Sequence, residues 1–222
     1  MKNRSKFYRL AQEIALKLQD IPRWWDGKTA ILEMKNAGFN QWRQMEWVGF
    51  YFQFLCEKFL RGVMEIPGPK YGNVRFDGFK GVPWDFKTHA INTSYHQIIV
   101  NDSEATSKAI KDYGSVGLIL ALGKATYNDE ARTFQKWHET LKGGKSKYEL
   151  ERIRRGAWSR LRKVDFALQQ ISFIEIDGPV LVKCGSFQRD FRNSDGKPRR
   201  EKVLLDLEKI EEDLVYYLDF TT

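Results

Sequence analysis

Two aspartates and a lysine lie close together in one short segment, RFDGFKGVPWDFKTH, which spans residues 75–89. Seven residues separate Asp77 from Asp85, and Lys87 follows two positions later. Gathering two carboxylates is costly unless a cation lies between them, and Mg²⁺ takes carboxylate oxygens together with water and substrate phosphate. Such a metal lowers the pKa of a bound water and neutralises charge on a phosphate, and a lysine can stabilise the same charge. The pattern therefore indicates metal-assisted hydrolysis of a phosphate ester.

A β-hairpin is the element expected to position these side chains. Residues 73–77 and 82–91 are strand-like runs separated by a Gly-containing turn, which is the pattern of a hairpin. Successive side chains of a strand point to opposite faces, so the second run carries Asp85, Lys87 and His89 on one face. The first run ends on the other aspartate, which the turn returns to the side of Asp85. His89 either approaches a phosphate or is a hydrogen-bonded histidine at the sheet edge, and the second interpretation is favoured.

The motif Asp77…Asp85-Phe86-Lys87 resembles the D…(D/E)-x-K core of the PD-(D/E)xK nucleases, which include many type II restriction enzymes. The stretch KGVPWDFKT is especially similar to the short-spaced site of the methyl-directed mismatch-repair nickase. The resemblance implies that Asp77, Asp85 and the Phe86 carbonyl bind Mg²⁺ and that Lys87 serves the attacking water. One departure is Phe76, which stands where the family name has Pro.

The resemblance covers roughly residues 41–125, because the elements expected there follow the order of the family core. That core is a helix, three antiparallel strands, a second helix and a further buried strand. Many family members place a glutamate of the first helix near the metal. Glu46 and Glu57 share one polar stripe of the expected helix with Gly49 and Gln53. Glu46 is preferred to Glu57 as a catalytic residue, and the alternative is a solvent-facing stripe.

The sequence as a whole predicts a single α/β (α+β) nuclease domain over residues 1–222, with a restriction-endonuclease-like mixed sheet flanked by helices. The catalytic core is expected at about 41–125 and a DNA-contacting region at about 142–203. Apolar periodicity predicts helices at 4–20, 28–36, 41–61, 103–113, 129–141, 146–171 and 203–220. Apolar runs predict strands at 116–122, 171–176 and 180–184.

The positive charge of the chain is concentrated in one stretch. The formal net charge is +8, and residues 142–163 hold nine Lys or Arg against two Glu. A concentrated basic patch is typical of a surface that contacts a phosphate backbone, although a solvated helix face is the alternative. The candidate DNA-binding residues of this stretch are Lys145, Lys147, Arg152, Arg154, Arg155, Arg160, Arg162 and Lys163.

A second basic segment runs from Gln188 to Arg200, with a turn at Asp195-Gly196. The flanking strands and this turn favour a projecting ribbon, which fits the major groove, and there Arg can pair with guanine and Asn or Gln with adenine. The alternative is a basic loop that touches only phosphates. The candidate residues here are Arg189, Arg192, Arg199 and Arg200.

Several other classes of protein are not expected. No apolar run is long enough to cross a bilayer, the N-terminus lacks the apolar stretch of a signal peptide, and Cys56 and Cys184 are far apart. These features favour a cytoplasmic protein with free thiols and no membrane partner. Gly117–Lys124 superficially resembles a P-loop, but the glycine spacing is wrong and Ala125 replaces the required hydroxyl. We therefore expect no nucleotide cofactor, and there is no motor or methyltransferase motif.

Together these features predict a Mg²⁺-dependent endodeoxyribonuclease that acts on double-stranded DNA. A stand-alone type II restriction endonuclease is favoured, acting as a homodimer because cutting both strands of a symmetric site needs two active sites. One alternative is a nicking or junction-resolving nuclease of the same fold. Another is a non-catalytic DNA-binding protein in which Asp77 and Asp85 are surface charges.

Overall fold

A six-stranded mixed sheet forms the centre of the molecule. The computed structural model describes residues 2–127, 131–157, 161–188 and 200–221. The strands lie in the order β1-β8-β7-β5-β4, and β11 pairs with β8 on the edge that β1 also uses. β5 and β7 are parallel, and the other pairs are antiparallel. These strands are β1 (Trp24–Asp26), β4 (Gly78–Lys80), β5 (Val82–Ala90), β7 (Val116–Tyr127), β8 (Lys163–Ile176) and β11 (Val215–Asp219).

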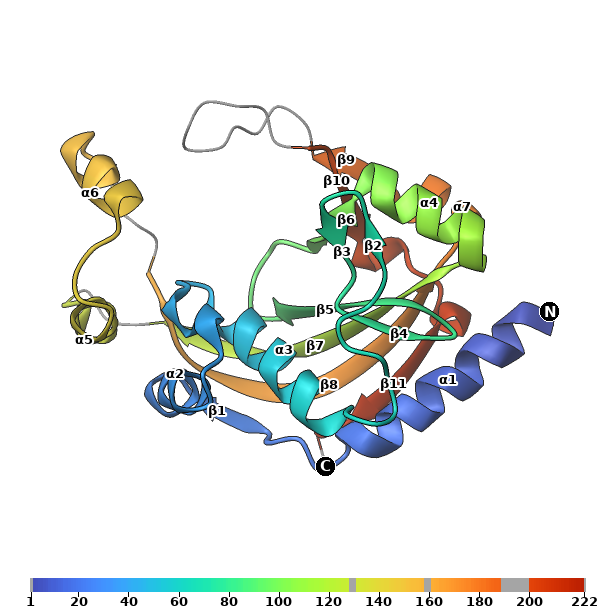
Figure 1. The fold of residues 1–222 in the computed structure, drawn as a ribbon, viewed down its shortest axis with the longest axis horizontal. Helices are drawn as coiled ribbons and strands as arrows, with labels where there is room; N and C mark the ends of the chain where they lie inside the picture. The colour runs from blue at the N-terminus through green and yellow to red at the C-terminus, as the bar shows by residue number, and fades with distance from the viewer. Residues whose placement is uncertain (1, 128–130, 158–160, 189–199, 222) are drawn as a thin grey trace.

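Helices cover one face of this sheet (Figure 1). The apolar stripe of the first helix is buried, as are the aromatic side chains Trp25, Phe52 and Trp84 of the same core. Trp84 packs directly over β7 because its neighbour there is Gly117, where a Cβ atom would lie only 2.2 Å from the indole ring. The elements on this face are α1 (Lys2–Leu18), α2 (Gly27–Asn36), the 3₁₀ helix η1 (Asn40–Arg43) and α3 (Trp47–Phe59).

A three-stranded sheet with the order β6-β10-β9 packs on the other face. Val100 and Leu205 of this small sheet meet Leu118 and Leu120 of β7 in a second core. Because β7 contributes to both cores, its continuous apolar run is buried on both faces. The elements of this layer are β6 (Gln97–Asp102), α4 (Ser103–Tyr113), α7 (Gly178–Cys184), β9 (Gly185–Gln188) and β10 (Lys202–Asp206). The smaller elements are β2 (Lys70–Tyr71), β3 (Val74–Arg75), η2 (Leu207–Lys209) and η3 (Glu212–Leu214).

Two helices, α5 (Thr133–Leu141) and α6 (Lys147–Arg154), project at the end of the molecule away from α4 and α7 (Figure 1). We call them the α5–α6 arm. Buried polar side chains hold it together. Gln135 donates hydrogen bonds to Glu139 at 2.8 Å and to Glu149 at 3.0 Å, and Arg162 pairs with Glu149 at 3.3 Å. The arm therefore contains a buried network of polar and charged side chains.

The predicted fold class is confirmed, since a mixed sheet lies between helices and a second β layer. The helices predicted at 4–20, 28–36 and 103–113 are present as α1, α2 and α4, and the strand predicted at 116–122 is the first part of β7. The helix predicted at 41–61 is shorter, because α3 begins at Trp47 after the turn of η1. Among the described helices, none is long and apolar enough to span a membrane.

The predicted hairpin is present, but its first strand was placed wrongly. The strand that pairs with β5 is β4 (Gly78–Lys80), not residues 73–77, and Gly81 forms the turn with a positive φ of 70°. A positive φ favours glycine because it has no Cβ. The earlier run contributes β3, which pairs with β2 instead.

Four predictions in the second half of the chain are wrong or partly wrong. The predicted helix at 146–171 ends after α6, and most of its second half belongs to the long strand β8, which also contains the strand predicted at 171–176. The helix predicted at 129–141 begins at Thr133 within the described residues.

The strand predicted at 180–184 is helix α7, because Asp177 caps it by accepting a 2.9 Å hydrogen bond from the Val180 N–H and a proline stands in its first turn. The helix predicted at 203–220 is replaced by β10, two 3₁₀ turns and β11, since both strands find pairing partners.

Candidate active site

The β4–β5 hairpin brings Asp77 beside Asp85. Gly78 lies opposite Trp84 in this antiparallel pair, so the residue before Gly78 lies next to the residue after Trp84. The Phe86 N–H donates a 2.7 Å hydrogen bond to Asp77 Oδ2. This bond holds one oxygen of Asp77 against the strand that carries the second carboxylate.

Asp85 is almost completely buried, with 2% of its surface exposed. Its Oδ1 accepts a 3.1 Å hydrogen bond from Asn101 Nδ2, and its Oδ2 lies 3.7 Å from Lys87 Nζ. Oδ2 has no hydrogen-bond partner within the described part of the chain. The pKa of Asp85 is raised to about 7. Burial is the largest cause and the charge of Asp77 adds to it, while Lys87 acts in the opposite direction. The Oδ2 oxygen of this carboxylate is therefore buried, and no group of the described residues donates a hydrogen bond to it.

Lys87 and His89 follow Asp85 on the same face of β5. The Lys87 side chain is partly exposed, so its ammonium is accessible to a substrate. Burial lowers the pKa of the His89 imidazole, and the positive charge of Lys163 lowers it further. His89 is therefore held in its neutral form more strongly than an exposed histidine.

The two glutamates of the α3 stripe lie at opposite ends of the helix. Glu46 is the residue before α3, its side chain is 78% exposed, and it lies 3.7 Å from Lys163. Glu57 is in the last turn, where burial raises its pKa and the charge of Asp77 raises it further. The charge of Asp77 therefore acts on Glu57, whereas Glu46 lies beside Lys163. Helical spacing placed both residues on one stripe but could not indicate which end meets the hairpin.

The donor set suits a cation that keeps much of its hydration. No group of three or more His, Cys, Asp and Glu side chains is arranged to hold a metal ion within the described ranges. Mg²⁺ needs only one or two carboxylates because waters and substrate phosphate complete its octahedron. Asp77 and Asp85 supply two carboxylates, and the buried Oδ2 of Asp85 is left for such a ligand role. These residues therefore fit the cofactor that the sequence motif implies.

The basic stretch divides into internal and exposed residues. Arg162 is buried against Glu149, and Lys145 pairs with the buried Glu139, so both are part of the arm's own network. Lys163 lies beside Glu46. Lys145 is exposed although it pairs with Glu139. The other exposed candidates of the arm are Lys147, Arg154 and Arg155, and Arg152 is partly exposed.

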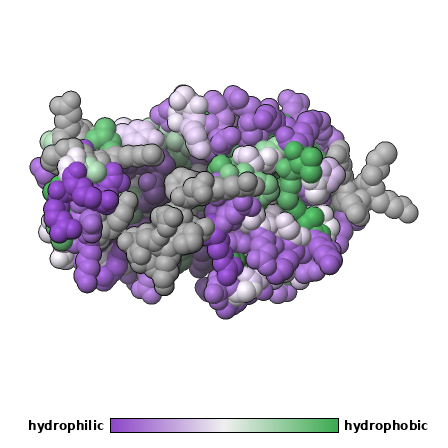
Figure 2. All heavy atoms as spheres, turned by 90° about the horizontal axis from the view of Figure 1, so that it is seen from above, coloured by the Kyte–Doolittle hydropathy of each residue, from purple (hydrophilic) through white to green (hydrophobic). Residues whose placement is uncertain are grey.

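Hydrophilic side chains cover much of this end of the molecule (Figure 2). Arg200 is exposed, whereas Arg160, Arg189, Arg192 and Arg199 lie outside the described residues.

Two residues near Asp85 had no signal in the sequence. Asn101 is the penultimate residue of β6, and Lys202 begins β10, opposite Asp102. The Lys202 charge acts to lower the pKa of Asp85. Both residues are far from the motif in sequence and belong to the small sheet, so only the packing of that sheet on the central one brings them near Asp85.

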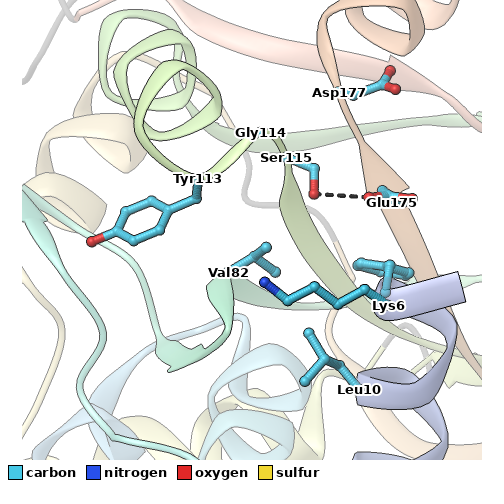
Figure 3. Close-up of a pocket in the computed structure, with 9 residues that line it drawn as sticks. Lys6, Leu10, Val82, Tyr113, Gly114, Ser115, Glu175 and Asp177 are labelled. Atoms are coloured by element: carbon cyan, nitrogen blue, oxygen red, sulfur yellow. Dashed lines mark hydrogen bonds between the residues drawn. The ribbon is translucent and has the colours of Figure 1, made fainter. Parts of the chain in front are cut away.

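A separate pocket lies near the start of β7, and none of the candidate site residues lines it (Figure 3). Its polar lining includes Lys6, Ser115 and Asp177, and the Ser115 hydroxyl donates a 2.9 Å hydrogen bond to Glu175. The pocket is therefore distinct from the carboxylate site.

Comparisons with known proteins give one structural likeness. No protein-family model matches the sequence, and no curated protein matches it significantly. Among solved structures, the chain is similar to the restriction endonuclease BglI bound to its DNA recognition sequence, with 9% identity and a TM-score of 0.43 over 100% of this chain and 91% of that one. A likeness this distant establishes neither activity nor residue correspondence.

Proposed function

We propose that the chain is a Mg²⁺-dependent endodeoxyribonuclease, and specifically a type II restriction endonuclease. The observation that carries the proposal is the state of Asp85, whose Oδ2 is buried without a hydrogen bond beside Asp77 and Lys87. Oxygens of Asp102, Glu149 and Asp165 are also buried without a partner among the described residues, so what distinguishes Asp85 is that its carboxylate lies beside Asp77 and Lys87. The resemblance of this segment to the PD-(D/E)xK motif supports the same interpretation.

Each residue has a specific role in this proposal. Asp77 and Asp85 hold Mg²⁺ together with the Phe86 carbonyl. When bound, the cation supplies a water of lowered pKa and neutralises charge on the scissile phosphate. Lys87 orients the attacking water or stabilises the charge that develops on phosphate oxygens, because its ammonium lies on the same face as Asp85 and remains accessible.

Binding of the substrate is assigned to the exposed basic residues. Lys147, Arg154 and Arg155 of the α5–α6 arm contact the DNA backbone, and Arg200 with the neighbouring basic residues contacts base edges or phosphates. Two such chains form a homodimer on a symmetric site, so that each strand meets one set of carboxylates. A nicking or junction-resolving nuclease would use the same site in a single chain.

A digestion experiment tests the proposal. The protein is incubated with phage DNA in Mg²⁺ and in EDTA, beside Asp85→Ala and the control Asp112→Ala, whose exposed carboxylate accepts a hydrogen bond from the Tyr71 hydroxyl. We expect discrete fragments in Mg²⁺ from the wild type and the control, no cleavage in EDTA, and loss of cleavage in Asp85→Ala with DNA binding retained.

The other outcomes are equally informative. A smear of fragments would support a nuclease without sequence specificity and contradict the restriction assignment. Intact but retarded DNA under all conditions would indicate a binding protein, and wild-type cutting by Asp85→Ala would show that the carboxylate site is not catalytic.

A further inference from the structure

The Asp85 carboxylate is held by a residue of the other sheet. Asn101 is the penultimate residue of β6, is 8% exposed, and donates a 3.1 Å hydrogen bond from Nδ2 to Asp85 Oδ1. β5 and β6 belong to different sheets. The bond therefore crosses between the two layers and does not belong to the secondary structure of either.

The orientation of the Asn101 amide is fixed by a second hydrogen bond. Its Oδ1 accepts a 2.8 Å bond from the Asp102 N–H. If the amide were flipped, an oxygen would face the Asp85 carboxylate and an NH₂ group would face an N–H donor, so both contacts would be repulsive. Only one orientation satisfies both neighbours, and it presents a donor to Asp85.

Asn101 is itself anchored by the start of α4. Asp102 Oδ1 caps this helix by accepting a 3.2 Å bond from the Ala105 N–H, and the Thr106 hydroxyl donates a 2.8 Å bond to the Asp102 carbonyl. Asp102 and Thr106 are both buried. The amide is therefore hydrogen-bonded to the buried residue that caps α4, which restricts the orientations open to its donor.

We infer that Asn101 is a positioning residue for the proposed metal site. By occupying Oδ1 it fixes the rotation of the Asp85 carboxylate and leaves Oδ2 turned toward Lys87, with no hydrogen-bond partner in the described structure. Partners that orient a ligating carboxylate typically change metal affinity by about 10–100-fold when they are removed. Asn101 touches neither substrate nor metal in this role. The inference rests on the proposed function, since it assigns Asp85 to Mg²⁺.

Metal binding without DNA is the appropriate measurement, because it needs no catalysis. Binding of Mn²⁺, used as a probe for the Mg²⁺ site, is measured by titration calorimetry for the wild type, Asn101→Ala and Asn101→Ser. Asn92→Ala is the matched control, because the Asn92 side chain also makes two hydrogen bonds, at 2.8 and 3.0 Å, but to the backbone of Ala125.

We expect Asn101→Ala to weaken Mn²⁺ binding by about 10–100-fold and Asn92→Ala to retain wild-type affinity. Asn101→Ser, which keeps a donor, should lie between the wild type and Asn101→Ala, and it also serves if the alanine variant does not fold. Thermal unfolding of each variant identifies a loss that comes only from instability.

Wild-type Mn²⁺ affinity in folded Asn101→Ala would overturn the positioning role, and so would an equal loss in Asn92→Ala. Asp85→Ala separates this failure from failure of the proposed function. If Asp85→Ala binds Mn²⁺ as the wild type does, the metal site itself is wrong, and the role of Asn101 is wrong with it.

Discussion

Glu57 and Glu46, at opposite ends of α3, differ in their relation to the carboxylate site. Burial raises the pKa of Glu57, and the negative charge of Asp77 raises it further. Glu46, in contrast, is exposed and lies beside Lys163. A carboxylate near the ligands can hold a water or a second cation, while an exposed ion pair contributes little.

We therefore predict that Glu57→Gln slows DNA cleavage by about 10-fold or more, whereas Glu46→Gln cleaves at the wild-type rate. The Gln side chain is similar in size to Glu, so packing is retained and each change removes one charge. Initial rates on a short duplex at fixed Mg²⁺ provide the measurement. A slow Glu46→Gln variant with an unaffected Glu57→Gln variant would restore the sequence-based preference for Glu46.

At this scale the sequence was informative where residues are neighbours along the chain. Asp85, Phe86 and Lys87 lie in one strand, so period-2 geometry alone places Asp85 and Lys87 on one face. Asn101 and Lys202 could not be predicted, since nothing in a single sequence indicates which residues another sheet brings to a buried carboxylate. The choice between Glu46 and Glu57 also needs more than the sequence, because it depends on how α3 lies on β5, and the preference for Glu46 stays a prediction.

At the scale of elements, the arm offers a test of DNA contact. Arg154 and Arg155 are exposed at the end of α6, where Arg154 is only weakly engaged with Glu151 at 3.5 Å. Arg154→Glu with Arg155→Glu should lower the slope of log K against log salt by about two, or about one per lost phosphate contact.

Binding to a catalytically inactive Asp85→Ala background, measured by fluorescence anisotropy over a range of salt concentrations, checks this expectation. The matched control is Lys108→Glu with Lys111→Glu on α4, which carries two exposed lysines at the other end of the molecule. If both pairs change the slope equally, the effect is one of overall charge and the arm has no specific role.

The contact between α5 and η1 predicts a pH dependence of stability. His138 is buried, and its Nε2 lies 2.9 Å from the Trp42 carbonyl oxygen. Burial, followed by the charge of Lys142, lowers its pKa from 6.5 to about 4, while Glu139 opposes this effect. The unfolded chain therefore binds a proton in the range between pH 6.5 and 4 that the folded chain excludes, so stability falls as pH decreases through this range.

Replacing His138 by Gln removes the titratable imidazole and retains a hydrogen-bond donor for the Trp42 carbonyl. Between pH 7 and pH 5 we expect the free energy of unfolding to decrease in the wild type by about 2 kcal/mol more than in His138→Gln. Urea unfolding at the two pH values measures the difference. The exposed histidine variant His96→Gln should behave like the wild type, and a His138→Gln variant with unchanged pH dependence would contradict the assignment.

Elements with local end signals were predictable, and those formed by pairing were not. α4 has the Asp102 cap before it and Gly114, with a φ of 88°, after it, so its limits could be predicted from sequence. Residues 163–176 carry no such signals, and β8 is a strand because β7, β1 and β11 pair with it. Strand preference depends on neighbours more than on residue type, which explains why this segment was predicted to be largely helical.

At the scale of the whole molecule, the proposed homodimer predicts how a circular DNA substrate is cut. Two sites acting in one complex should convert supercoiled plasmid with a single target directly to linear DNA. A chain that acts alone should first accumulate the nicked circle. Gel analysis over a time course distinguishes these cases, and sedimentation of the 26.1 kDa chain gives its assembly state. Persistent nicked circles would favour the nicking alternative without altering the carboxylate site.

The position of Asp85 between two layers also bears on how the protein is made. The hairpin with Asp77, Asp85 and Lys87 is synthesised long before β10, which pairs with β6 along Lys202–Asp206. Until β10 is present, the strand that carries Asn101 lacks its partner. A half-synthesised or truncated chain therefore contains every candidate catalytic side chain without the assembled support behind Asp85.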